Sequence, residues 1–325
     1  MAERVALIGS ETLLGRELED VLARSASHPA ITPFAANGEG NFGSQDGEAV
    51  FVAPLEAKSI RGHRTIVVAG AAEGARKAYD LAKQISPLPR VIDCTGYLEN
   101  EPEARIVASS QPRSAWLLIV PHPAAVAIAQ VLRSLSSNSK ITRSIVNVLE
   151  PASERGQAGI TELQQQTASL LSFKTLDKKV FDAQLSFNLL PQYGEDAPIK
   201  LADIEQRIER HIATLLDHPP MPSLRLVQAP VFHGYSISLW VEFAAAPSAA
   251  GLGEALASAG IDVRGPDLEA PTNVGAAGQS GLFAGDIRMD PNNPRAAWLW
   301  IACDNLRLRA DIAAALLSGV KGAKP

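Results

Sequence analysis

The first third of the chain alternates short apolar segments with segments of helical spacing, and this alternation constrains the fold more than any other feature of the sequence. In the segment 13–25, Leu14, Leu18 and Leu22 recur at helical spacing, and residues 73–85 form a second such segment. The segments with the composition of buried strands are residues 3–9, 31–36, 49–54, 64–70, 89–96 and 115–120. Strands that alternate with helices pair in parallel through crossovers, so the sequence predicts an α/β domain with a doubly wound parallel sheet. Residues 36–48 are rich in glycine and polar residues and are expected to form a loop.

The character of the sequence changes after residue 121. Residues 201–217 form a strong helical pattern, and residues 223–245 alternate apolar and polar residues as long antiparallel strands do. Further expected elements are the helices 123–135, 159–172 and 308–320 and the strands 140–151 and 297–305. The side chains expected to point inward are Leu163, Ala168 and Leu171 on one helix and Ile204, Ile208, Ile212 and Leu215 on another. A second domain of the α+β class with a large, partly apolar sheet is therefore expected.

Charge and cysteine content exclude several classes of function. The 30 Lys and Arg residues against 35 Asp and Glu residues leave no basic surplus for nucleic acid or an acidic membrane. Cys94 and Cys303 make neither a disulfide framework nor a metal site, and His211 and His218 are too far apart on one helix to share a metal ion. Prolines interrupt the longest apolar stretch, residues 115–132, and no signal peptide precedes it. A cytoplasmic protein without a metal site is expected.

The strand-to-helix turn at residues 9–15 is a candidate cofactor site. The turn 9–15, GSETLLG, stands where a dinucleotide pyrophosphate would bind at a helix N-terminus, with Gly9, Ser10, Thr12, Leu13 and Gly15 as the candidate residues. Thr12 replaces the middle glycine of the usual fingerprint, so a plain structural turn is the alternative. The second strand ends in residues 34–37, FAAN, which offer no acid for a ribose hydroxyl and no arginine for a 2′-phosphate.

Seven segments resemble, in the same order, those of one family, the aspartate-semialdehyde dehydrogenases. They are GSETLLG (9–15), VVAGAA (67–72), VIDCTGYLE (91–99), FNLLPQYG (187–194), APVFHGYSISLWVEF (229–243), AGDIRMD (284–290) and LWIACDNLR (299–307). The resemblance implies a Rossmann-like domain over residues 1–121, a dimerisation domain with a large mixed sheet over 122–304, and a helix over 305–325 that packs on the first domain. It also implies a homodimer, whose apolar sheet surface would include Ile237, Leu239, Trp240, Trp298 and Trp300.

The family reaction, as the resemblance implies it, is the reversible reductive dephosphorylation of an acyl phosphate with NADPH. A cysteine attacks the acyl carbon, a histidine acts as acid and base, a glutamine orients the intermediate, and arginines hold the substrate. The VVAGAA segment adds Ala69 and Gly70 to the candidate cofactor residues, because it resembles the stretch beside the nicotinamide.

This chain departs from the family at its functional positions. The nucleophile position falls on Pro123 in PHPAA (121–125), where a proline suits the first turn of a helix but offers no nucleophile. The histidine falls on Tyr235, the glutamine on Glu150, a substrate arginine on Glu99, a cofactor-facing asparagine near Ala313, and the middle glycine on Thr12. The phosphorylating dehydrogenase activity is therefore not expected, and binding of NADP is doubtful.

Two functions follow as hypotheses. The first is a non-catalytic dimeric member of the family with a binding or regulatory role. The alternative is an NADP-dependent oxidoreductase for an aldehyde or semialdehyde, with a rebuilt site that uses Tyr235 and the candidates His122 and His233. Cys94 is a lesser candidate for a replacement nucleophile, and buried packing is the commoner role of such a cysteine. Glu99 and Glu150 could jointly bind a cation, although exposed surface acids are more common.

Overall fold

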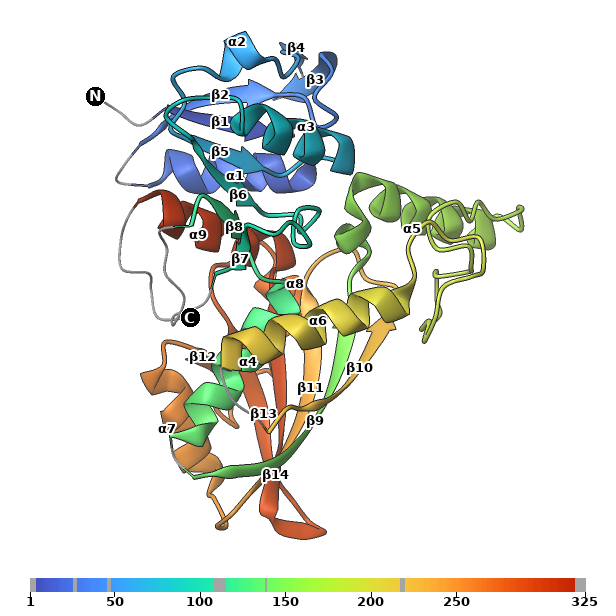
Figure 1. The fold of residues 1–325 in the computed structure, drawn as a ribbon. Helices are drawn as coiled ribbons and strands as arrows, with labels where there is room; N and C mark the ends of the chain where they lie inside the picture. Colours follow the sequence, from blue (N-terminus) through green and yellow to red (C-terminus); the bar gives the residue numbers. More distant parts are fainter. Residues whose placement is uncertain are drawn as a thin grey trace. The chain divides into compact units, whose positions relative to one another are not determined.

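The computed structural model describes residues 4–25, 28–45, 48–107, 115–137, 139–216 and 220–318. The chain forms two compact units (Figure 1). The first unit contains Met1–His122 and Arg309–Pro325, and the second contains Pro123–Leu308. None of the helices in the described part of the chain has the length and apolar composition that a membrane crossing requires.

The first unit is built on a six-stranded parallel sheet. In sheet order its strands are β2 (Ala30–Phe34), β1 (Arg4–Ile8), β5 (Thr65–Val68), β6 (Arg90–Asp93), β8 (Leu117–Ile119) and β7 (Ala104–Ile106). The helices of this unit include α1 (Leu13–Ala23), α2 (Ala57–Ile60) and α3 (Ala72–Ala82). Residues 5–8 and 66–68 are fully buried, because parallel strands in the middle of such a sheet are covered on both faces. The expected α/β fold with a doubly wound parallel sheet is confirmed.

One part of the first unit differs from the expectation. Residues 41–45 lie in the expected loop 36–48, yet they form strand β3 (Asn41–Gln45), which pairs antiparallel with β4 (Glu48–Val52). The pairing of β3 with β4 is made by backbone hydrogen bonds, which glycine and polar residues can form as well as apolar ones. The loop prediction was therefore wrong for these residues.

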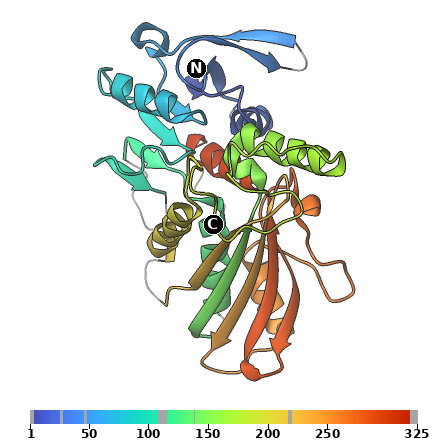
Figure 2. The same ribbon diagram turned by 90° about the vertical axis from the view of Figure 1, so that its right-hand side faces the viewer.

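The second unit contains a six-stranded mixed sheet. In sheet order its strands are β10 (Ser223–Gln228), β9 (Ile141–Glu150), β11 (Tyr235–Phe243), β14 (Asn293–Cys303), β13 (Phe283–Asp290) and β12 (Asp262–Val263). β10 pairs in parallel with β9, and β9 separates it from β11 (Figure 2). The expectation of antiparallel strands over residues 223–245 is met by β11, which pairs antiparallel with β9 and β14. It was wrong for β10, because the segment 229–234 carries the chain across β9.

The two faces of this sheet are buried to different degrees. Along β11 every second residue, from Tyr235 to Phe243, is buried, and the residues between them are partly exposed. Ile237 and Leu239 therefore face the interior, which corrects their assignment to an apolar dimer surface. Trp240 and Trp298 are paired across β11 and β14 on the less buried face.

Helices α4 (Pro123–Ser136), α6 (Leu201–Leu216) and α7 (Ala249–Ser258) accompany this sheet (Figure 1). α4 packs against both α6 and α7 and also contacts β9. All four apolar residues of the expected α6 stripe are buried, as predicted: Ile204, Ile208, Ile212 and Leu215. The closing helix α9 (Asn305–Leu317) begins in this unit and continues into the first one. The end of the expected closing helix, residues 319–325, and His218 lie outside the described residues.

Helix α5 (Gly156–Leu171) buries polar side chains where apolar ones were expected. Leu163 is buried, but Ala168 and Leu171 are exposed, which corrects their inward assignment. The buried carboxylate of Glu162 instead accepts hydrogen bonds from Val180 N (2.5 Å) and Phe181 N (3.3 Å).

Gln166, one helical turn later on α5, also binds the backbone of the following loop. Its side-chain oxygen accepts from Leu185 N at 2.7 Å and from Ser186 N at 3.1 Å. The loop after α5 is therefore held by the polar face of α5, because its backbone donors would otherwise be buried without partners.

Replacing Glu162 with glutamine tests this arrangement. Burial is the main cause that raises the pKa of Glu162 above its ordinary value, so the protonated form is favoured in the folded protein. The stabilising contribution of this group is complete below the unfolded pKa near 4.5 and is lost as the pH rises through the higher folded pKa. Glu162→Gln cannot ionise, but its amide keeps only one acceptor oxygen and places an NH2 group against the second backbone N–H, so it should be less stable than wild type at pH 4. We expect this deficit to shrink as the pH rises to 7, because only the wild-type carboxyl group loses its stabilising contribution over that range. Urea unfolding at pH 4 to 7 measures the difference.

Glu254→Gln is the matched control, because Glu254 is an exposed acid on helix α7. It should show no such pH-dependent difference from wild type. Glu162→Ala should cost about 2 kcal/mol or more at every pH, since it leaves two buried donors without acceptors. A difference between Glu162→Gln and wild type that does not vary with pH would contradict the assignment.

Candidate functional site

The candidate nucleophile position lies at the first residue of a buried helix. Pro123 begins α4, and its side chain is buried. Proline is favoured at this place because its φ angle is already helical and its missing N–H would have had no helical partner. The position therefore initiates a helix, and its side chain has no atom that could attack an acyl carbon.

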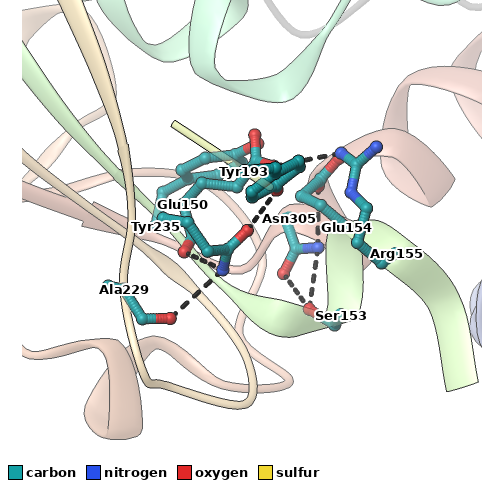
Figure 3. Close-up of polar contacts among 9 residues, drawn as sticks. Glu150, Ser153, Glu154, Arg155, Tyr193, Ala229, Tyr235 and Asn305 are labelled. Carbon is teal, nitrogen blue, oxygen red and sulfur yellow. Dashed lines mark hydrogen bonds and ion pairs between the residues drawn. The ribbon is translucent and has the colours of Figure 1, made fainter. Parts of the chain in front are cut away.

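Glu150 and Tyr235 are brought together by the register of the second sheet. Glu150 ends β9 and Tyr235 begins β11, and the neighbouring residues Leu149 and Ser236 are directly paired. Both side chains are fully buried, and the Tyr235 hydroxyl donates to Oε2 of Glu150 at 3.3 Å (Figure 3). The expectation that Glu150 is an exposed surface acid was therefore wrong.

Arg155 supplies the positive charge for this buried carboxylate. It lies at the end of the 3-10 turn Ala152–Arg155, and its Nη2 is 3.0 Å from Oε1 of Glu150. The Arg155 side chain is only 10% exposed. Burial works against its charge, but the carboxylates of Glu150 and Glu154 more than compensate, so the pKa of Arg155 is raised. The sequence resemblance did not indicate Arg155, because its role depends on a partner five residues earlier on another element.

Tyr193 and Gln228 complete the cluster. The Tyr193 hydroxyl donates to Oε1 of Gln228 at 2.6 Å and lies 3.4 Å from Oε1 of Glu150. Gln228 Nε2 in turn donates to the backbone oxygens of Glu150 and Ala229 (Figure 3). Burial, and then the neighbouring Glu150 charge, raise the pKa of Tyr193, so this phenol stays protonated. We call Glu150, Arg155, Tyr193, Gln228 and Tyr235 the buried polar cluster.

A second set of contacts fixes the turn that carries Arg155. Asn305 is fully buried at the start of α9 and donates to Ser153 Oγ (3.1 Å) and to Glu154 Oε1 (2.8 Å). Its own side-chain oxygen accepts from Gly234 N, which precedes Tyr235 (3.2 Å). The turn and the start of β11 are therefore joined through one amide, as Figure 3 shows for Asn305 and Ser153.

The two candidate histidines lie in different units, and both cysteines are buried. Cys94 and Cys303 are buried, and burial raises both thiol pKa values, so neither is a thiolate nucleophile at neutral pH. His122 is buried in the first unit, and His233 is partly exposed in the second. Among the described residues, no three His, Cys, Asp or Glu side chains lie close enough to hold a metal ion.

The turn after β1 keeps the glycine geometry of a dinucleotide-binding turn. Gly9 has φ +87°, and a Cβ there would be 2.5 Å from the Cα of Gly70, at the end of β5. A Cβ on Gly15 would be 2.0 Å from the Gly9 carbonyl oxygen. The first glycine permits the tight turn and the last permits close helix packing, which are two of the three roles in the fingerprint.

Thr12, at the middle position, acts as the N-cap of α1. Its Oγ1 accepts from Gly15 N at 2.9 Å and lies within hydrogen-bond distance of the carbonyl oxygens of Gly9 (2.8 Å) and Ala69 (3.0 Å). The hydroxyl thus stabilises the turn and engages one N–H at the helix N-terminus. Ser10 is buried in the turn and Leu13 is the first residue of α1. The turn, the two glycines and the helix start fit the approach of a dinucleotide, which would supply hydride chemistry through its nicotinamide.

Comparisons with known proteins identify the family. The model of the semialdehyde dehydrogenase dimerisation domain matches residues 132–308. A USG-1 protein homolog of Pseudomonas aeruginosa is 32% identical over 236 residues, which cover 70% of each chain. An aspartate-semialdehyde dehydrogenase of Rickettsia bellii is 26% identical over 320 residues, 93% of each chain. The solved structure of a probable aspartate-semialdehyde dehydrogenase from Pseudomonas aeruginosa is 28% identical, has a TM-score of 0.83 and covers 98% of each chain. The chain belongs to the semialdehyde dehydrogenase family and is similar to its aspartate-semialdehyde dehydrogenases.

The buried polar cluster predicts a clear order of stability among variants. Glu150→Ala should lower the free energy of unfolding by about 3–5 kcal/mol, because it leaves the Arg155 charge buried without its partner. Tyr235→Phe removes the hydrogen bond to Glu150 and should cost about 1 kcal/mol. Urea unfolding at pH 7 measures both. A loss below about 1 kcal/mol for Glu150→Ala would show that the ion pair is not part of the folded core.

Proposed function

We propose that this chain is a dimeric family member that lacks phosphorylating semialdehyde dehydrogenase activity and has a binding or regulatory role. The observation that carries the proposal is Pro123, the first residue of a buried helix at the position that the resemblance assigns to the nucleophile. Acyl transfer to the enzyme requires a nucleophile there, and a proline side chain cannot form or release a thioester.

The buried polar cluster supports the same proposal. A general acid or base must exchange a proton with the substrate, so its proton-carrying atom has to reach the reacting group. The Tyr235 hydroxyl donates to Glu150 instead, and Glu150 is paired with Arg155. These contacts also weaken the alternative of a rebuilt NADP-dependent oxidoreductase, because Tyr235 is fully buried and its proton is directed at a carboxylate.

An activity assay tests the proposal directly. The purified protein is given aspartate semialdehyde, phosphate and either NADP or NAD, with the Rickettsia bellii aspartate-semialdehyde dehydrogenase as the active control. We expect no reduction of either nucleotide above the protein-free rate. Pro123→Cys should remain inactive, because Glu150 and Tyr235 still occupy the other two positions.

Measurable turnover by the wild-type protein would refute the proposal. If Tyr235→Phe then abolished that turnover while the protein remained folded, the rebuilt oxidoreductase would be the correct function. A folded Tyr235→Phe variant that kept the activity would point to a different set of catalytic residues.

The dimer is the second part of the proposal. Its support is the match to a dimerisation domain, together with Trp240, Trp298 and Trp300 on the less buried face of the second sheet. Light scattering at micromolar concentration should give twice the chain mass of 34.4 kDa. Trp298→Lys should shift the protein toward the monomer, since a charge would be buried in the interface. Val274→Lys, on the exposed short helix α8 (Asn273–Ala276), is the control and should leave the dimer intact. A wild-type monomer would exclude this part.

A further inference from the structure

The carboxyl end of β2 has an acidic side chain that is not adjacent to it in the sequence. In dinucleotide-binding folds, an acid at the end of the second strand accepts from the ribose 2′-hydroxyl, and a nearby cation accommodates a 2′-phosphate. β2 ends at Phe34, and the residues that follow, Ala35, Ala36 and Asn37, carry no charge. The structure brings Glu11 there from the turn after β1, where its Oε1 accepts from Ala36 N at 2.8 Å.

Ala36 itself is held in place from two further directions. Its carbonyl oxygen accepts from Ala71 N at 2.9 Å, and a Cβ on Gly74 would lie 2.1 Å from the same oxygen. The turn after β1 is tied to β2 as well, because Gly9 N donates to Phe34 O at 2.7 Å. The place of the Glu11 carboxylate at the end of β2 is therefore set by the backbone of three loops.

We infer that Glu11 makes the dinucleotide-binding turn after β1 selective for a nicotinamide dinucleotide without a 2′-phosphate, that is, for NAD over NADP. Each carboxylate oxygen has two acceptor positions, so Oε1 of Glu11 can accept from a ribose hydroxyl and keep its bond to Ala36 N, while Oε2 is buried. A 2′-phosphate at the same place would bring about −1.5 to −2 charges beside the carboxylate, and like charges repel. The inference rests on the proposed function, because it names the ligand of a protein that binds a dinucleotide without catalysing the dehydrogenase reaction.

One cation close to this loop provides the opposing argument. Lys77 on α3 donates to Gly38 O at 2.9 Å, and Glu39 lies one residue further along the loop. A lysine beside the second strand would favour a 2′-phosphate if its ammonium reached it. In this structure its ammonium is bound to a backbone carbonyl, whereas the carboxylate of Glu11 is bound at Ala36. Glu11 therefore favours NAD and Lys77 would favour NADP, and mutation of each residue separates the two effects.

The experiment is isothermal titration of the full-length protein with NAD and with NADP at fixed ionic strength. We expect NAD to bind at least about tenfold more tightly than NADP, because a like-charge contact costs more than 1.4 kcal/mol. Glu11→Gln keeps an oxygen for Ala36 N and removes the charge, so it should reduce the NAD preference several-fold, mainly by strengthening NADP binding. Glu39→Gln removes an acid from the loop after β2 and is the matched control, with the preference unchanged.

Three results would overturn the inference. They are equal or tighter binding of NADP by the wild-type protein, a selective loss of NADP affinity in Lys77→Met, and the absence of binding of either dinucleotide at millimolar concentration. Thermal unfolding with AMP and with 2′,5′-ADP repeats the comparison without the nicotinamide. Failure here leaves the proposed lack of dehydrogenase activity standing, since that is decided by turnover and not by binding.

Discussion

The second unit depends on one buried carboxylate and the charge that neutralises it. Glu150 ends the strand β9 inside the protein, where an unpaired ion would cost several kcal/mol, and Arg155 lies within hydrogen-bond distance of it. The strand end, the 3-10 turn and the start of β11 must all keep their places for this pair to form. Tyr193 extends the requirement to the loop after α5, because its hydroxyl lies between Gln228 and Glu150.

A buried polar network and acid–base catalysis place different demands on the same side chains. A catalytic acid or base has to be reachable and has to change its protonation state during the reaction. Here Glu150, Tyr193 and Tyr235 are buried and their polar atoms are bonded to one another, so they stabilise the fold. Pro123 begins helix α4, where its preset φ angle favours the helical backbone.

The sequence predicted elements well where a single periodicity decided them, and less well where polar groups were buried. The buried apolar residues 5–8 of β1 and 66–68 of β5, and the apolar stripe of α6, follow from hydrophobic pattern alone. On α5 the pattern pointed to Ala168 and Leu171, but Glu162 and Gln166 face the interior because the loop after the helix needs their acceptor oxygens. The backbone N–H groups that require these acceptors lie up to twenty residues away in the sequence, so a local hydrophobic pattern cannot predict them. β3 was missed for a related reason, since its pairing with β4 depends on backbone bonds and not on side-chain hydrophobicity.

By itself, the sequence determined the fold class and the family, since both are carried by residue identities and spacings along the chain. Only the tertiary structure decided what the replaced residues do. It paired Glu150 with Tyr235 through strand register and with Arg155 through the 3-10 turn, and it placed Glu11 at Ala36 although twenty-five residues separate them. The physical reason is that a hydrogen bond or an ion pair is made within about 3 Å in space, and the distance between two side chains on different elements is set by sheet order and packing.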